Sequence, residues 1–157
     1  MTGSNTFSAS LDGSGKRFAV VTARFNPEIT DNLLSGALAR LADHGVATGD
    51  IDVYRVPGAW ELPQTAARLA ARGGHHGIIA LGCVIRGETP HFDYVAGEAA
   101  YGLGEVARSS PVAVVFGVLT TDTREQAERR ADPKGMDKGG EVASAAVEMA
   151  MLFDVLA

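Results

Sequence analysis

Cysteine is almost missing from this chain, since Cys83 is the single one among 157 residues. One cysteine cannot form a disulfide framework or a Cys-rich metal site within the chain. Long apolar runs are missing as well, and none reaches the length of a membrane span. The N-terminus lacks the basic region and apolar stretch of a secretory signal. We therefore expect a cytoplasmic protein without membrane contact, metal or cofactor.

An excess of basic residues is also absent. The chain has 14 Lys and Arg against 19 Asp and Glu, which gives a formal net charge of -5. No basic stripe stands out, so we do not expect nucleic acid as a partner. Hydrophobic residues make up 46% of the chain, which suffices for one core. Residues 1–16 are polar and predict a flexible tail, and residues 17–157 predict one folded domain.

Apolar runs and helical patterns alternate after residue 16. The apolar runs are continuous, which is typical of parallel strands that are covered on both faces. Strand–helix alternation indicates right-handed βαβ units. We predict a three-layer, flavodoxin-like α/β domain with a parallel four-stranded sheet of order 2-1-3-4. The strands are expected at 18–21, 51–56, 77–85 and 112–119, and the helices at about 27–44, 60–72, 90–108, 122–130 and 141–155.

Helix-end signals support this assignment. Asn26-Pro27-Glu28 supplies a cap, a proline at the first helical position and an acid in the first turn. Gly45 and Gly73-Gly74 are suited to ending helices. Asp122 and Glu125 have the spacing of a capping box, which predicts that a short helix begins there.

Ligands of such sheets bind beyond the carboxyl ends of the strands. The four segments at this edge bring together an aromatic ring, a carboxylate, a Gly-Glu-Thr turn and a histidine. They are Arg24-Phe25-Asn26, Pro57 to Glu61, Arg86 to His91, and Thr120-Thr121-Asp122.

The turn after the third strand gives the strongest local signal. Thr89 is expected to cap the next helix, with Pro90 at its first position. The free N–H groups and the helix dipole there favour an anion such as phosphate. His91 would lie in the first helical turn, where the dipole favours the neutral imidazole that proton transfer needs. A helix cap followed by a surface histidine explains the same residues equally well.

The remaining candidates each have a purely structural alternative. Phe25 could stack on a planar ligand or pack over the sheet edge. Glu61 could bind hydroxyl groups or be an ordinary acid in a first helical turn. Arg130 could hold phosphate or stabilise a helix C-terminus. Lys138 could equally be an ordinary solvated lysine in a loop.

Two further features argue against a nucleophile and against a metal site. Cys83 lies within an apolar strand and is expected to be a small buried hydrophobe rather than a nucleophile. His75-His76 is expected to form an exposed turn, and it lacks partners at metal-ligand spacing.

Taken together, the loops and flanking strands resemble those of the 6,7-dimethyl-8-ribityllumazine synthase family. The resemblance extends over about residues 17–153 and is strongest in the run Gly-Cys-Val-Ile-Arg-Gly-Glu-Thr-Pro-His-Phe-Asp-Tyr-Val. The matching segments are 24–26, 56–63, 82–95, 116–121 and 125–127.

The resemblance implies a transferase of riboflavin biosynthesis. The reaction condenses 5-amino-6-(D-ribitylamino)uracil with 3,4-dihydroxy-2-butanone 4-phosphate, and gives the lumazine, phosphate and water. An alternative is an inactive flavin- or lumazine-binding assembly protein of the same fold. A signalling receiver domain would need an acidic pair after the first strand, where this chain has Arg24-Phe25-Asn26. A riboflavin synthase of the archaeal type would use the lumazine as its substrate.

The resemblance also implies roles for individual residues. His91 would transfer protons. Phe25 would stack on the pyrimidine ring, while Ala59, Trp60 and Glu61 would contact the ribityl chain. Backbone groups of Cys83, Val84 and Ile85 would line the ring edge. The ketose phosphate would be held by Gly87, Glu88, Thr89 and Arg130.

Phe116, Arg130 and Lys138 match positions that a neighbouring subunit contributes, so the resemblance implies a homo-oligomer built from pentamers with shared active sites. The compact segment 131–137 favours a closed icosahedral shell, although its sequence departs from the glycine-rich stretch with Asn of many relatives. The tail before Lys16 could add a strand to a neighbour's sheet. A riboflavin synthase is a candidate partner.

Overall fold

The computed structural model describes residues 3–157, so Met1 and Thr2 of the expected tail lie outside the described residues. The described chain forms one parallel sheet of order β2-β1-β3-β4, which confirms the predicted flavodoxin-like fold. The strands are β1 (Phe18–Ala23), β2 (Ile51–Val56), β3 (Gly77–Ile85) and β4 (Ala113–Thr121). The helices are α1 (Pro27–Asp43), α2 (Leu62–Arg72), α3 (His91–Ser109), α4 (Arg124–Ala131) and α5 (Lys138–Leu156), with 3-10 turns η1 (Thr48–Asp50) and η2 (Ala59–Glu61).

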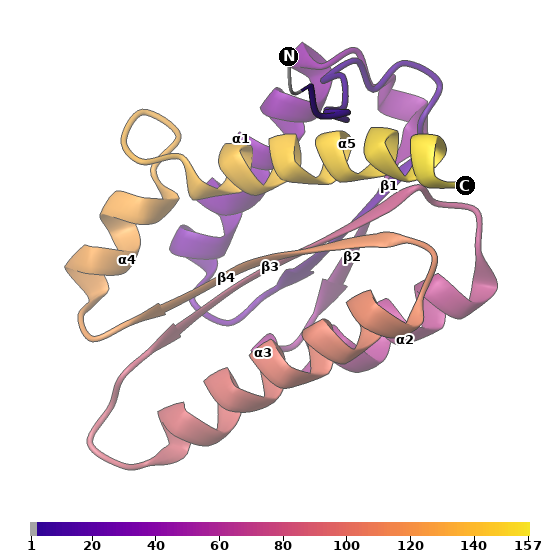
Figure 1. Cartoon of the computed structure of the whole chain (residues 1–157). Coiled ribbons are helices and arrows are strands. Elements are labelled where there is room, and N and C mark those ends of the chain that lie inside the picture. Colours follow the sequence, from indigo (N-terminus) through magenta and orange to yellow (C-terminus); the bar gives the residue numbers. More distant parts are fainter. Residues whose placement is uncertain (1–2) are drawn as a thin grey trace.

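The helices form a layer on each face of the sheet. Helices α1 and α5 cover one face, α2 and α3 cover the other, and α4 lies near the carboxyl end of β4 (Figure 1). Strand side chains alternate between the two layers, so Phe18 and Val20 join the core under α1 and α5 while Ala19 and Val21 join the other. None of the helices in residues 3–157 is long and apolar enough to cross a membrane.

Strand length sets the position of a pocket at the carboxyl edge of the sheet. Strands β1 and β2 have six residues each, whereas β3 and β4 have nine. The pairing of β1 with β3 ends at Thr22 and Leu81, but β3 continues alongside β4 as far as Ile85 and Thr121. Residues 82–85 therefore have a strand neighbour on one side only, and we call this part of β3 the ledge.

The last helix begins earlier than predicted. It starts at Lys138 instead of Glu141, because the Asp137 carboxylate accepts a hydrogen bond from Gly140 N (3.2 Å) and caps the first turn. The two glycines of this turn are buried where α5 crosses α1. A Cβ added to Gly139 would lie 2.0 Å from the carbonyl oxygen of Leu33, so the crossing requires glycine.

The predicted capping box of α4 is shifted by one residue. Thr123 and Gln126 form it: the Thr123 hydroxyl accepts from Gln126 N, and the Gln126 side chain accepts from Thr123 N. Asp122 cannot serve as the cap because its carboxylate accepts a hydrogen bond from Arg86 Nε (3.0 Å). The prediction that Asp122 and Glu125 form the box was therefore wrong.

His75 was predicted to lie in an exposed turn, and that prediction was wrong. Its side chain is only 4% exposed, and its Nε2 lies 2.7 Å from Asp52 Oδ2. Asp52 also accepts a hydrogen bond from Arg17 (3.0 Å), so the histidine is packed inside a polar cluster at the amino end of the sheet. His76 is exposed, and its Nδ1 accepts a hydrogen bond from the Arg17 backbone N–H.

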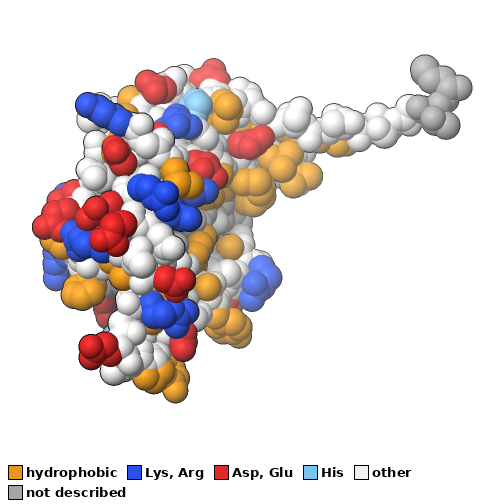
Figure 2. Space-filling view, turned by 90° about the vertical axis from the view of Figure 1, so that its left-hand side faces the viewer, with side chains coloured by type: hydrophobic (Ala, Val, Ile, Leu, Met, Phe, Trp, Pro, Cys, Tyr) orange, Lys and Arg blue, Asp and Glu red, His pale blue; other side chains and the backbone are white. Residues whose placement is uncertain are grey.

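The N-terminal segment extends away from the body of the molecule (Figure 2). It meets the domain before residue 17, since Gly13 is buried and its N–H donates to the His44 carbonyl (2.7 Å). Lys16 pairs with Asp154 of α5. The flexibility expected of residues 1–16 stays a prediction.

Candidate active site

A pocket of about 780 Å³ opens beside the ledge of β3. Its walls come from the segments that follow β1, β2 and β3, where the fold predicts a ligand site. The volume is within the range of small-molecule sites. The lining residues are Phe25, Asn26, Pro57, Gly58, Ala59, Trp60, Glu61, Cys83, Val84, Ile85, Gly87, Thr89, His91, Phe92, Tyr94 and Val95.

Phe25 forms the first wall, between β1 and α1. Its side chain is 69% exposed, which argues against the alternative of packing over the sheet edge. The Phe25 N–H donates to the carbonyl of Pro57 (3.1 Å), and Arg24 N donates to Val56 (2.8 Å). These bonds continue the β1–β2 pairing into the loops, and they fix the aromatic residue beside the η2 segment.

The second wall is η2. Ala59 is buried, whereas Trp60 is half exposed at the surface of the pocket. The Glu61 carbonyl accepts a hydrogen bond from Thr65, while its carboxylate forms no salt bridge within residues 3–157. That carboxylate is available to accept hydrogen bonds from ligand hydroxyls.

The ledge forms the third wall. Burial raises the pKa of the Cys83 thiol to about 11, so the thiolate needed for nucleophilic attack does not form near neutral pH. Cys83 therefore contributes shape and backbone groups, as its place in an apolar strand predicted.

The turn after β3 differs in detail from the prediction. Helix α3 begins at His91 with Pro90 as its N-cap residue, and the His91 N–H donates a long hydrogen bond to Thr89 Oγ1 (3.5 Å). Pro90 itself supplies no capping side chain, so this helix start suits an anion. Gly87 and Thr89 line the pocket, whereas Glu88 is exposed outside its lining.

His91 projects from the first turn of α3 into the same pocket. The residue is exposed, and its imidazole forms no hydrogen bond to any other residue that the structure describes. Its ring nitrogens are therefore accessible to a ligand or to water, as a proton-transfer group requires.

Arg86, in the turn after β3, is held by neighbouring acids rather than directed into the pocket. Its guanidinium pairs with Asp122 (3.0 Å) and Asp93 (3.4 Å) and lies over the Phe92 ring, 4.4 Å from its centre. The hydrogen bond to Asp122, together with both negative charges, raises the arginine pKa. The side chain therefore connects the turn to α3 and β4.

Phe116, Arg130 and Lys138 lie in a separate hollow of about 310 Å³ between β4, α4 and α5. Arg130 donates to the Gln126 carbonyl of its own helix (3.0 Å), and Lys138 pairs with Glu141 (3.1 Å). One chain thus brings together most of the predicted residues but leaves these three, as well as Glu88, outside the pocket lining.

The prediction missed several lining residues. Tyr94 and Val95 follow His91 by three and four positions, so helical periodicity alone places them on the same face. Phe92 could not be found in this way, and Asn26 was placed at the ligand-binding edge but given no role there.

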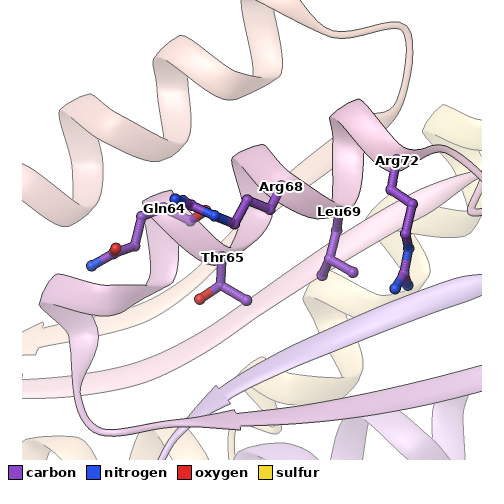
Figure 3. Close-up of a pocket in the computed structure, with 5 residues that line it drawn as sticks. All are labelled: Gln64, Thr65, Arg68, Leu69 and Arg72. Atoms are coloured by element: carbon purple, nitrogen blue, oxygen red, sulfur yellow. The ribbon is translucent and has the colours of Figure 1, made fainter.

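A smaller hollow of about 230 Å³ lies beside α2. Figure 3 shows that its five labelled residues all belong to this helix, among them Thr65, Leu69 and Arg72. Its lining contains no histidine or carboxylate, so the chemistry belongs to the larger pocket.

The carboxyl-end side of the molecule carries both signs of charge interspersed with hydrophobic patches (Figure 2). A continuous basic field is not visible on this face, in keeping with the formal net charge of -5. A flavodoxin-like sheet with such an apolar pocket, an accessible histidine and an uncapped helix start defines a small-molecule-binding α/β protein of enzyme type.

Comparison with known proteins gives the particular family. The profile of the 6,7-dimethyl-8-ribityllumazine synthase family matches residues 15–154. A protein of that name from Desulfotalea psychrophila is 50% identical over 97% of this chain and 98% of its own length. A protein of the same name from Nitratidesulfovibrio vulgaris is 48% identical over 96% of this chain and 97% of its own length. Another from Anaeromyxobacter dehalogenans is 48% identical over 98% of this chain and 94% of its own length. The chain belongs to the 6,7-dimethyl-8-ribityllumazine synthase family.

Proposed function

We propose that the pocket beside the ledge binds 5-amino-6-(D-ribitylamino)uracil and 3,4-dihydroxy-2-butanone 4-phosphate together. As a member of its family, the chain is a transferase that forms 6,7-dimethyl-8-ribityllumazine in riboflavin biosynthesis. One observation carries the assignment to this pocket: Phe25, Glu61, and the ledge with His91 come from three separate segments of the chain and line one cavity. No observation favours the alternative of an inactive assembly protein.

The uracil fits the side of the pocket between Phe25 and the ledge. The exposed Phe25 ring offers a face for stacking, and the backbone groups of Ile85 on the ledge offer hydrogen bonds to the ring edge. The ribityl hydroxyls would then reach Ala59, Trp60 and the unpaired Glu61 carboxylate.

The ketose phosphate fits the start of α3. Gly87 and Thr89 border the pocket there, and the start of α3, where Pro90 supplies no capping side chain, favours an anion. Glu88 would contribute through its backbone only, because a second negative charge would repel the phosphate.

His91 lies where protons must move. The uracil amine attacks the ketone to give a carbinolamine and then, with loss of water, an imine. Phosphate leaves by elimination, and the ribityl-bearing nitrogen closes the ring with loss of water. Each step transfers a proton, which one imidazole and water can mediate. Holding two reactants together supplies the larger part of the acceleration.

A neighbouring copy of the chain would complete the site. Phe116, Arg130 and Lys138 form a separate group on the β4 side, where Arg130 bonds to a carbonyl of its own helix and Lys138 pairs with Glu141. Presented across an interface, Arg130 would clamp the phosphate. This separation supports sites that are shared between copies of the chain. The family resemblance implies that the copies form pentamers and that a riboflavin synthase consumes the product.

The test is to mix the purified protein with both substrates and follow the absorbance of the lumazine. Product should form only when both are present, and an equimolar amount of phosphate should be released. A reaction with the lumazine alone would indicate a riboflavin synthase instead. Absence of product from a folded oligomer would contradict the proposal.

A further inference from the structure

Asn26 has a backbone conformation that is unusual for a residue with a side chain. Its φ of 61° and ψ of 58° lie in the left-handed region, which Asn tolerates better than most residues. It precedes α1 but does not cap the helix, since its side chain accepts no hydrogen bond from the first turn. The side chain is therefore used for something else.

The Asn26 amide donates a hydrogen bond to the carbonyl oxygen of Cys83, with a distance of 3.0 Å from Nδ2. This carbonyl belongs to the ledge, two residues beyond the last β1 partner of β3. The amide thus takes the place of the missing strand neighbour. It ties the loop that carries Phe25 to the strand that carries the backbone groups of the pocket.

Strand alternation shows which ledge groups stay free. Arg86 N donates to Thr121 O on the β4 side, so the backbone groups of Ile85 point to the opposite side, as those of Cys83 do. Asn26 occupies the Cys83 carbonyl, and the N–H and C=O of Ile85 are left facing the pocket. An N–H beside a C=O is complementary to the imide edge of a uracil ring.

We propose that Asn26 is a positioning residue for the pyrimidine substrate. It holds the Phe25 loop at a fixed distance from the ledge, so that the ring stacks on Phe25 while its edge pairs with Ile85. This role rests on the proposed function, because it assumes that the uracil binds between these two walls. Asn26 does not act on the reacting atoms, and its effect should appear in binding of the uracil.

Two variants separate the amide from the backbone. Asn26→Gly removes the amide and suits the left-handed conformation, whereas Asn26→Ala removes the amide and strains it. Both should weaken binding of 5-amino-6-(D-ribitylamino)uracil by roughly three- to tenfold, the usual effect of one hydrogen bond. Both should lower the melting temperature through the lost hydrogen bond, and Asn26→Ala should lower it more because of the added strain. The KM of the ketose phosphate should stay at the wild-type value in both.

In Asn26→Asp, lowering the pH should restore part of the uracil binding. At neutral pH the carboxylate would face the Cys83 carbonyl as a second acceptor, and the two oxygens would repel each other. Below pH 5 a growing fraction of the carboxyl group is protonated and can donate to that carbonyl. Uracil affinity of Asn26→Asp, divided by that of Asn26→Gly at the same pH, should therefore rise as the pH falls.

Calorimetric titration with 5-amino-6-(D-ribitylamino)uracil, without the ketose phosphate, measures these affinities. If the wild type binds the uracil and both neutral variants bind it equally well, Asn26 has no positioning role. Equal weakening of both substrates, or a flat ratio for Asn26→Asp, would also overturn it. Wild-type protein that binds no uracil would overturn the proposed function, and the Asn26 role with it.

Discussion

Asp52 and His75 form a hydrogen bond of 2.7 Å between Oδ2 and Nε2, at the end of the sheet opposite the pocket. The bond from His75 lowers the pKa of Asp52, with Arg17 adding to the effect. A carboxyl group whose pKa is lower in the folded protein stabilises the fold at pH values above its ordinary pKa. This contribution is lost as the pH falls through the lower pKa of the folded state.

We therefore expect Asp52→Ala to lower the free energy of unfolding at pH 6 to 7 by about 1 kcal/mol, since Asp52 is partly exposed and its charge is screened. The difference from wild type should shrink below about pH 4. Urea unfolding at several pH values measures it, with Asp52→Asn as the variant that keeps a hydrogen bond. A difference that persists unchanged at pH 3 would contradict the assignment.

His91→Ala should slow turnover by about a hundredfold without abolishing it, because proximity of the two substrates remains. The KM values of both substrates should change little. Steady-state kinetics with each substrate varied in turn measures this, and a chelator should leave the wild-type rate intact. Turnover equal to wild type would remove His91 from the mechanism.

Arg130→Ala should raise the KM of the ketose phosphate by roughly ten- to a hundredfold, because a charge-assisted contact to phosphate is lost. The KM of the uracil should change far less. Arg129→Ala is the matched control, since Arg129 is the adjacent exposed arginine on the same helix. Equal weakening of both substrates would place Arg130 outside the phosphate site.

Cys83 should resist thiol reagents in the native protein. Its pKa of about 11, raised by burial, leaves little thiolate at pH 8, and the thiolate fraction should increase as the pH approaches 11. Labelling with 5,5′-dithiobis(2-nitrobenzoate) at pH 8 should be at least roughly a hundredfold slower than in guanidinium chloride. Rapid native labelling would show that the ledge opens in solution.

The assembly is predicted to be a closed shell of pentamers. Light scattering on a sizing column measures its mass directly. A free pentamer or a pair of pentamers would contradict the shell while keeping the shared sites. A monomer with full activity would contradict the transfer of Phe116, Arg130 and Lys138 to a neighbour.

The sheet and its order could be predicted because the strands coincide with continuous apolar runs in the sequence. Strand β3 is the clearest case, since eight of its nine residues are buried. The carboxyl-end rule then predicts that Phe25, Glu61 and His91 lie near one another.

What the sequence did not reveal depends on contacts between distant residues. His75 is buried because Asp52, 23 positions away, lies beside it. Gly139 looks like a loop residue, yet it is helical because Asp137 caps the helix, and it is glycine because Leu33 of α1 leaves no room for a side chain. Similarly, the Asn26 side chain bonds to Cys83, 57 positions away, and no local signal indicates this.

The number of residues in the ledge sets the size of the cavity. Residues 82–85 extend past the last β1 partner, which corresponds to about 13 Å of strand at the usual rise per residue. Lengthening or shortening β1 would therefore change the cavity in increments of one residue. Because side chains alternate between faces, only increments of two residues keep the core pattern intact. A redesigned enzyme for a longer or shorter substrate would have to change in steps of roughly 6 to 7 Å.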